Sequence, residues 1–200
     1  MTAGRFIAFE GGEACGKSTQ AERLAARIGA VLTREPGGTA LGEEIRSLLL
    51  HADHPVDVWA EALLMAAARA QHVHEVIAPA LDRGRHVVTD RFTASSIAYQ
   101  GYGRGLPLDD VATLSNVATG ALEPDLYVLL DMTVEEAAAR RGRAHDRMEA
   151  AGDEFHRRVR DGFLEIAASD PARWVVIDAS RSIEEVEAAV LSRVAGIISV

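Results

Sequence analysis

The stretch Gly11-Gly-Glu-Ala-Cys-Gly-Lys-Ser-Thr19 matches the spacing G-x-x-x-x-G-K-S in full. It follows an apolar run at residues 5–10 and precedes a helical pattern at residues 20–28. Glycines at both ends of such a loop let successive N–H groups converge on one anion, and the positive end of the next helix points at the same anion. A chance match in a glycine turn is the alternative, but the strand before and the helix after are the context that a phosphate-binding loop requires.

The loop predicts a nucleotide site with defined roles for two side chains. Lys17 can reach the β- and γ-phosphates, and the Ser18 hydroxyl can ligate magnesium. Lys17 is also the only lysine among 21 basic residues, so arginine stands wherever either residue would serve. A compact ammonium fits between two phosphates better than a planar guanidinium does. The predicted ATP-binding residues of the loop are Gly11, Gly12, Glu13, Ala14, Cys15, Gly16, Lys17, Ser18 and Thr19.

Length and composition favour one α/β domain over residues 1–200. The chain is 48% apolar and 26% charged, as in an ordinary globular protein. A net charge of −9 argues against binding a nucleic-acid polymer, which requires a basic surface. The sequence has no apolar run of bilayer length and no signal-peptide pattern, and its single cysteine fits a reducing compartment, so we expect a cytoplasmic protein without membrane contact.

The cysteine and histidines offer little chemistry of their own. The amide dipoles of the loop would favour a thiolate at Cys15, but no base is near it in sequence, so a small residue that merely fits is the better interpretation. The seven histidines lack metal-site spacing and are interpreted as surface or helix residues.

Apolar runs separated by longer helical patterns predict a doubly wound, five-stranded parallel sheet, a P-loop NTPase fold of three layers. We expect strands at 6–9, 30–33, 86–89, 126–130 and 174–177. We expect helices at 17–28, 40–51, 57–83, 108–119, 133–141, 149–169 and 182–195, with Thr133 and Ser182 as caps.

Ligands of such sheets lie at the carboxyl ends of the strands, and the residues there are polar. The turn at 33–39 contains Pro36 and two glycines, with a plain surface turn as the alternative. Asp90 is placed to orient magnesium, and Arg91 can bind a phosphate with two parallel hydrogen bonds. The alternative is that the two residues form a buried structural ion pair. Asp178 and Ala179 form a short turn that could border a purine.

Four arginines lie within residues 140–147 around a glycine, between two expected helices. A solvated basic face is the usual explanation of such a cluster. In an acidic chain with a phosphate loop, we favour a lid at about 140–150 that closes over the transferring phosphoryl group.

With these pieces placed, the chain resembles the thymidylate kinases among the P-loop nucleoside monophosphate kinases, from the first strand to the Asp178 turn. The most specific match is Thr33-Arg-Glu-Pro-Gly-Gly38, which in this family lies against the acceptor nucleotide. Four further matches follow in order: Arg46-Ser-Leu-Leu-Leu50, Ala67-Ala-Arg-Ala-Gln71, Asp90-Arg91 with 95–101, and Asp146-Arg147-Met-Glu149.

The resemblance implies transfer of the ATP γ-phosphoryl group to dTMP, giving dTDP and ADP for dTTP biosynthesis, with Mg²⁺ and a homodimer formed through 57–83. It implies that Arg69 hydrogen-bonds thymine O4, that Tyr99 packs under the deoxyribose, and that Arg91 holds the acceptor phosphate. Glu10 would lie near the sugar 3′-hydroxyl and the magnesium waters. The implied substrate residues are Glu10, Glu35, Pro36, Gly37, Arg46, Met65, Arg69, Arg91, Ser96, Tyr99 and Gln100, and the implied metal residues are Ser18, Asp90 and Glu10.

The chain departs from the family pattern at two places. Met65 stands where the family commonly stacks a phenylalanine on thymine, and a thioether covers a ring with less rigid geometry. The loop also lacks the arginine that some members carry, so the lid must supply the catalytic cation. Arg143 and Arg147 are the candidates, with Arg140 and Arg141 in reserve.

A phosphate nucleophile is largely ionised at neutral pH, so the reaction needs no general base. The catalytic residues are then cations: Lys17, Arg91, Arg143 and Arg147. One rival is a kinase for another nucleotide or a deoxynucleoside. A GTPase switch is the other, but the chain has no second lysine for an Asn-Lys-x-Asp motif and no aspartate followed by glycine three residues on.

Overall fold

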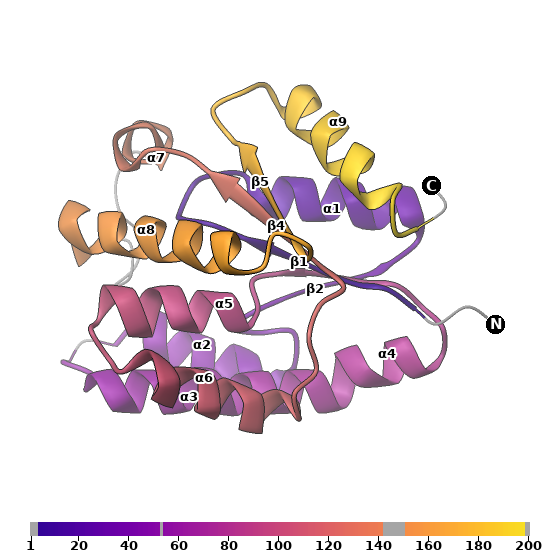
Figure 1. Cartoon of the computed structure of the whole chain (residues 1–200). Helices are drawn as coiled ribbons and strands as arrows, with labels where there is room; N and C mark the ends of the chain where they lie inside the picture. The colour runs from indigo at the N-terminus through magenta and orange to yellow at the C-terminus, as the bar shows by residue number, and fades with distance from the viewer. Residues whose placement is uncertain (1–3, 53, 142–150, 199–200) are drawn as a thin grey trace.

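The computed structural model describes residues 4–52, 54–141 and 151–198, and within them one parallel sheet of five strands in the order β2-β3-β1-β4-β5. The strands are β1 (Phe6–Glu10), β2 (Val31–Arg34), β3 (Val87–Asp90), β4 (Leu126–Asp131) and β5 (Trp174–Asp178). Figure 1 shows helices on both faces of this sheet. The predicted doubly wound α/β fold is confirmed.

One or more helices separate each strand from the next along the chain. They are α1 (Lys17–Ile28), α2 (Ala40–Leu50), α3 (Val58–His72), α4 (Ala78–Asp82), α5 (Thr93–Ser96), α6 (Leu108–Thr119), α7 (Val134–Arg141), α8 (Asp153–Ser169) and α9 (Ile183–Val194), with π-helical segments η1 (Val73–Ile77) and η2 (Ile97–Gly103). No helix in the described ranges is both long and apolar enough to cross a bilayer.

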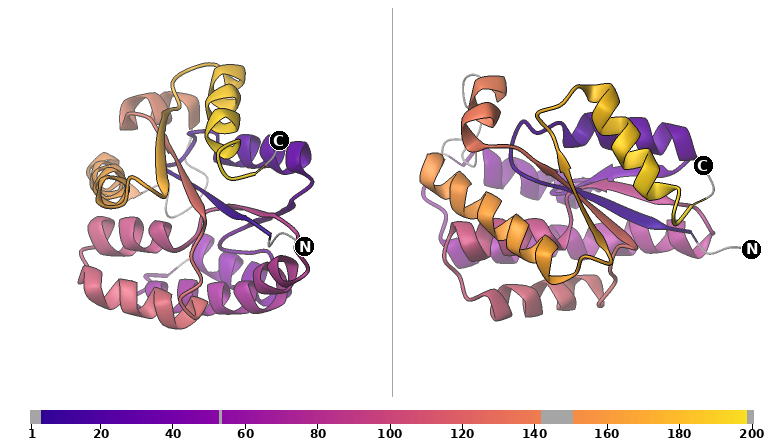
Figure 2. Two further views of the ribbon diagram at one scale, coloured as in Figure 1. Left: turned by 45° about the vertical axis from the view of Figure 1, so that its right-hand side comes forward. Right: turned by 45° about the horizontal axis from the view of Figure 1, so that its top comes forward.

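The alternation of side chains along the strands divides the core between the two faces of the sheet. Phe6 and Ala8 of β1 belong to one buried cluster with residues of η1, η2 and α8. Ile7 and Phe9, one residue along, belong to a second cluster with residues of α1 and α9. Figures 1 and 2 show α1 and α9 on one side of the sheet and α3, α5 and α8 on the other.

The helix predicted over 57–83 is present, but its hydrogen bonding changes in the middle. Residues 58–72 are α-helical, 73–77 form a π-helical turn, and 78–82 are α-helical again. Pro79 lies just beyond the π turn and has no N–H to donate to the preceding turn. The wider turn before it accommodates this missing donor.

The helix predicted over 149–169 begins at Asp153, which corrects its start. Gly152 has φ +90°, a left-handed conformation that cannot continue a right-handed helix backward. Residues 149 and 150 lie outside the described ranges. The Ser182 cap is confirmed as a complete capping box with Glu185.

A helix at 93–103 was not predicted from the sequence. The segment follows β3 and comprises α5 and η2. It contains serine, tyrosine and glycine, which are weak helix formers, so local preference gives little sign of it. Packing against α8 holds it instead, with the Tyr99 ring in edge contact with Phe155 and Phe163.

Candidate active site

The predicted phosphate loop has the backbone geometry of an anion cradle. Gly11 and Gly16 have φ +138° and +88°, and α1 begins at Lys17, directly after Gly16. A Cβ at Gly11 would lie 2.4 Å from the Leu130 carbonyl oxygen, so only glycine fits there. Lys17 Nζ donates to the Gly12 carbonyl oxygen at 2.5 Å, which holds the ammonium over the loop.

A cavity beside this loop, called here the loop cavity, takes in most but not all of the predicted nucleotide residues. Gly11, Gly12 and Cys15 do not line it, and Cys15 is 4% exposed within the core, as a small fitting residue would be. The lining consists of Glu13, Ala14, Gly16, Lys17, Ser18, Thr19, Arg34, Glu35, Arg46, Asp90 and Arg91.

Ser18 and Asp90 meet at the loop cavity, although they are far apart in sequence. Ser18 Oγ donates to Asp90 Oδ2 at 2.5 Å. The other carboxylate oxygen, Oδ1, is buried and has no hydrogen-bond partner in the described part of the chain. A hydroxyl and an unpartnered carboxylate oxygen are hard oxygen ligands, the kind that Mg²⁺ prefers beside phosphates. The described residues contain no group of three or more His, Cys, Asp or Glu that could hold a metal alone.

Arg91 is the most connected side chain of the site. It donates to the Gly11 carbonyl oxygen at 2.8 Å, to Ser95 Oγ at 3.2 Å and to Glu13 Oε1 at 2.6 Å, and its guanidinium lies 4.9 Å from the centre of the Tyr99 ring. The ion pair of Arg91 is therefore with Glu13 and not with the neighbouring Asp90. The backbone φ of Arg91 is +74°, which is uncommon for a residue other than glycine. In this conformation the side chain points back toward the phosphate loop.

Glu13 is ionised at any pH at which the protein would work. Burial alone would raise its pKa, but the charges of Arg91 and Lys17 and the hydrogen bond from the Tyr99 hydroxyl outweigh it and lower the pKa to about 2. Burial lowers the pKa of Arg91, but the charge of Glu13 above all, with Tyr99, Asp90 and Glu10, raises that pKa well above its usual value. The ionised Glu13 carboxylate thus forms an ion pair with Arg91 in this structure.

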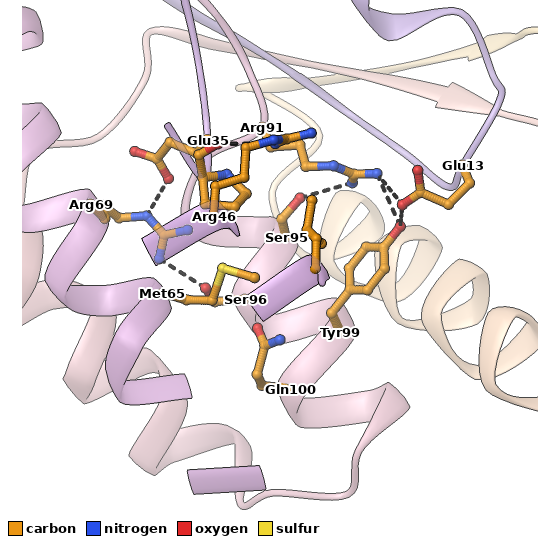
Figure 3. Close-up of a pocket in the computed structure, with 12 residues that line it drawn as sticks. Glu13, Glu35, Arg46, Met65, Arg69, Arg91, Ser95, Ser96, Tyr99 and Gln100 are labelled. Carbon is orange, nitrogen blue, oxygen red and sulfur yellow. Dashed lines mark hydrogen bonds and ion pairs between the residues drawn. The ribbon is translucent and has the colours of Figure 1, made fainter. Parts of the chain in front are cut away.

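A second cavity, the helix cavity, adjoins the first between α3 and the segment 93–103 (Figure 3). It gathers nine of the predicted substrate residues, but not Glu10 or Gly37. The lining consists of Glu13, Glu35, Pro36, Arg46, Leu50, Met65, Arg69, Arg91, Ser95, Ser96, Tyr99 and Gln100. The two cavities share part of their walls, because four residues line both: Glu13, Glu35, Arg46 and Arg91.

Arg69 lies in the wall of the helix cavity with its orientation fixed on three sides. Its Nε donates to Glu35 Oε2 at 2.6 Å, Nη1 to Ser96 Oγ at 2.8 Å and Nη2 to the Phe92 carbonyl oxygen at 3.0 Å. Behind it, Glu35 Oε1 contacts His72 Nδ1 at 2.9 Å, and His72 is fully buried. Gly38 leaves room for this ring, because a Cβ there would lie 2.9 Å from it.

Gln100 and Glu10 are both held by buried partners. Gln100 Nε2 donates to Glu61 Oε1 at 2.9 Å. Glu10 is fully buried and lines neither cavity, and its two oxygens accept from Phe92 N at 2.9 Å and Ser95 Oγ at 2.6 Å. Burial raises the Glu10 pKa to about 7, although Ser95, Arg91 and Phe92 pull it down. The structure therefore gives Glu10 a place behind the site, not in its wall.

The turn after β5 and the start of the predicted lid lie together. Arg140 donates to the carbonyl oxygens of Ala179 and Ser180 at 2.9 and 3.1 Å. Asp178 closes the turn by accepting from Ser180, and neither Asp178 nor Ala179 lines the two cavities. Arg143 and Arg147, with lid residues 142–150, lie outside the described residues, as does the side chain of Arg141.

Sequence reasoning missed Glu61, His72 and the role of Glu13 as the partner of Arg91. These contacts join residues 39, 37 and 78 positions apart. A signal for Glu61 existed, because a carboxylate within the alanine- and leucine-rich run 60–70 requires a buried partner. The sequence alone does not show which partner that is.

Comparison with known proteins gives concordant results. The family model described as "Thymidylate kinase" matches residues 9–190. Among curated proteins, thymidylate kinase of Bifidobacterium longum (strain NCC 2705) is 53% identical over 94% of this chain and 96% of its own length. That of Synechococcus sp. (strain JA-3-3Ab) is 53% identical over 94% and 93%. The crystal structure of thymidylate kinase from Ehrlichia chaffeensis superposes with a TM-score of 0.78 at 35% identity, covering 96% of this chain and 99% of that one.

Proposed function

The chain belongs to the thymidylate kinase family, and from that premise we propose how it moves the γ-phosphoryl group of ATP onto dTMP, forming dTDP and ADP in nucleotide biosynthesis. The loop cavity takes the phosphates of ATP and the helix cavity takes dTMP. The observation that carries this assignment is the shared wall: Arg91, Arg46, Glu13 and Glu35 line both cavities. Two nucleotides bound there would meet end to end at Arg91.

The cations of the site supply the catalysis in this proposal. Lys17, fixed over the loop by Gly12, neutralises charge between the β- and γ-phosphates. Arg91 donates two hydrogen bonds to the 5′-phosphate of dTMP. The phosphate thereby replaces the Glu13 carboxylate as the partner of the Arg91 guanidinium. The nucleophile is an ionised phosphate oxygen, so no side chain has to remove a proton. Alignment and charge neutralisation account for the rate.

Mg²⁺ fits the oxygen pair formed by Ser18 and Asp90, which would hold it directly or through water. When bound, the ion offsets charge on the β- and γ-phosphates. Glu10 acts from behind in this proposal, by fixing Ser95 and the backbone of Phe92.

The base and sugar of dTMP are assigned to the inner part of the helix cavity. Met65 covers the thymine ring, Arg69 donates to O4, and Ser96 and Gln100 complete the base-reading wall. Tyr99 packs under the deoxyribose, with Pro36 and Gly37 in the turn beside it. The predicted contacts of Asp178 and Ala179 with the adenine ring remain part of the proposal, supported by the docking of Arg140 on their turn.

Four further features remain predictions. Residues 1–200 form one kinase domain with a lid at about 140–150, and Arg143 and Arg147 reach the transferring phosphoryl group from it. The protein is cytoplasmic. It is a homodimer through the helical region 57–83, where Trp59 and Leu63 of α3 are 38% and 54% exposed.

An acceptor panel tests the assignment. Purified protein with Mg·ATP is offered dTMP, dUMP, dCMP, GMP and thymidine, and ADP formation is measured. We expect the highest kcat/KM with dTMP. Phosphorylation of dCMP or GMP without any of dTMP would reject the substrate assignment.

A further inference from the structure

The amide of Gln100 has its direction fixed by a buried carboxylate. Gln100 is 2% exposed on η2, and its Nε2 donates to Glu61 Oε1 at 2.9 Å. An ionised carboxylate only accepts hydrogen bonds, so it selects the amino end of the amide and turns the carbonyl end away. Figure 3 shows that oxygen on the Ser96 side of the side chain. In the described part of the chain no donor bonds to it.

Glu61 is itself held in place as an acceptor. It is fully buried on α3, and Arg104 donates to its two oxygens, each at 3.3 Å. The Arg104 guanidinium in turn lies 4.6 Å from the centre of the Phe155 ring. A buried carboxylate remains charged only with such partners. Both oxygens of Glu61 therefore accept from the Arg104 guanidinium, which fixes Glu61 as the acceptor of its hydrogen bond with Gln100.

Arg69 presents the opposite polarity in the same cavity wall. A guanidinium has five N–H donors and no acceptor, and Glu35 fixes its plane. The wall thus offers a donor from Arg69 and an acceptor from Gln100 Oε1. A base that satisfies both must present an acceptor beside a donor, as the O4 and N3–H of a keto pyrimidine do. Cytosine presents the reverse, a donor at N4 and an acceptor at N3.

We propose that Glu61 is a positioning residue for base specificity, which holds the Gln100 amide so that the site accepts keto pyrimidines and rejects cytosine. The inference rests on the proposed binding of dTMP in the helix cavity. Glu61 does not touch the substrate and acts through Gln100. Thymine and uracil share the keto pattern, so this device selects the class of base and not the 5-methyl group.

The test is a pair of substitutions at Glu61 that differ in hydrogen-bond polarity. In Glu61→Gln, the new amide can donate or accept, so Gln100 is free to turn over. We expect KM for dTMP to rise about tenfold with kcat nearly unchanged, and the ratio of kcat/KM for dTMP over dCMP to fall about tenfold or more. Glu61→Asp keeps an acceptor-only group, so it should retain the preference for dTMP even where KM rises.

Two controls separate this role from a general loosening of the fold. Arg104→Lys keeps a charge beside Glu61 but loses the guanidinium plane, and it should leave the dTMP/dCMP ratio unchanged. In a Gln100→Leu background, Glu61→Gln should have no further effect on the ratio, because the two residues act as one unit. Thermal melting of each variant checks that it is folded.

Specific outcomes overturn the proposal. It fails if folded Glu61→Gln keeps the wild-type dTMP/dCMP ratio, or if Glu61→Asp loses that ratio as fully as Glu61→Gln does. A measurement on the wild type needs no variant: N3-methyl-dTMP lacks the donor and should compete at least about tenfold more weakly than dTMP. Equal binding of the two would also overturn it. A wild type that phosphorylates no dTMP would instead refute the proposed function.

Discussion

Arg91 carries a local strain that is understandable from its contacts. A non-glycine residue with φ +74° costs on the order of 1–3 kcal/mol, and such residues persist where surrounding contacts hold them. Here the Gly11 carbonyl, Ser95 and Glu13 hold the guanidinium against the loop. The arginine is therefore oriented before any substrate arrives, which reduces the entropy lost on binding.

Arg91→Lys tests this orientation. Lysine keeps the charge but offers one ammonium where the arginine donates four hydrogen bonds, the fourth to the Tyr99 hydroxyl, and stacks on the Tyr99 ring. We expect kcat/KM for dTMP to fall by about a hundredfold or more, measured by steady-state kinetics. Arg27→Lys, at an exposed position on α1, is the matched control and should change nothing. A variant within threefold of wild type would show that charge alone is sufficient.

The raised pKa of Glu10 predicts that the free energy of unfolding depends on pH. Its pKa is about 7 in the folded chain and near 4.5 when unfolded, so the folded chain binds the proton more tightly. The free energy of unfolding should therefore fall as pH rises from about 4.5 to 7, by up to about 3 kcal/mol from this group. Glu10→Gln removes the titration. Urea unfolding of the wild type and Glu10→Gln at pH 5 and pH 8 isolates the contribution of Glu10. The contributions of all other titrating groups cancel when the free energies of unfolding of the two proteins are subtracted.

The expected result is that Glu10→Gln gains stability relative to wild type on going from pH 5 to pH 8. If the difference between the two proteins is the same at both pH values, Glu10 does not titrate in this range. The sequence marked Glu10 as polar and next to the loop, but its complete burial depends on Phe92 and Ser95, more than 80 positions away.

At the scale of elements, the strand ends show how far the sequence can be interpreted. Each hydrogen-bonded strand extends one residue beyond its predicted apolar run, and that last residue is polar in all five: Glu10, Arg34, Asp90, Asp131 and Asp178. The apolar pattern ends where the core ends, whereas the backbone pairing continues into the site. The segment 93–103 could not be predicted because its helix depends on packing and not on local preference.

Gly103→Ala tests that packing. A Cβ at Gly103 would lie 2.6 Å from Phe155 Cε2 and 2.9 Å from Val159 Cγ2, and both of these α8 side chains are buried. The overlap should cost about 1–3 kcal/mol in the free energy of unfolding. Because η2 also carries Tyr99 and Gln100, KM for dTMP should rise more than kcat falls.

Gly196→Ala is the matched control, since its nearest neighbour would be 3.4 Å away. Denaturant unfolding and steady-state kinetics are measured on both variants. If Gly103→Ala is as stable and as active as Gly196→Ala, then η2 can move away from α8 without disturbing the site.

At the scale of the whole molecule, the acidic chain confines its useful positive charge to one edge of the sheet. The net charge is −9, yet Lys17, Arg46 and Arg91 converge on the walls of the two cavities. The convergence of these cations was predictable from the doubly wound topology, because every β–α turn lies at the same edge of the sheet. The pairings within that edge were not predictable, since the order of strands in a sheet is not written in their apolar pattern.

The homodimer is the remaining proposal at this scale, and it predicts a surface. Trp59 and Leu63 lie one turn apart on α3 and are 38% and 54% exposed, and Leu48 of the adjoining α2 is 51% exposed. Burying such a face against its copy is favourable, whereas a charge on it would be desolvated without a partner. Leu63→Glu should therefore convert the dimer to a monomer in sedimentation velocity. Ile183→Glu, on α9 across the sheet, should stay dimeric (Figure 1). A dimeric Leu63→Glu, or a monomeric wild type, would contradict an interface on α3.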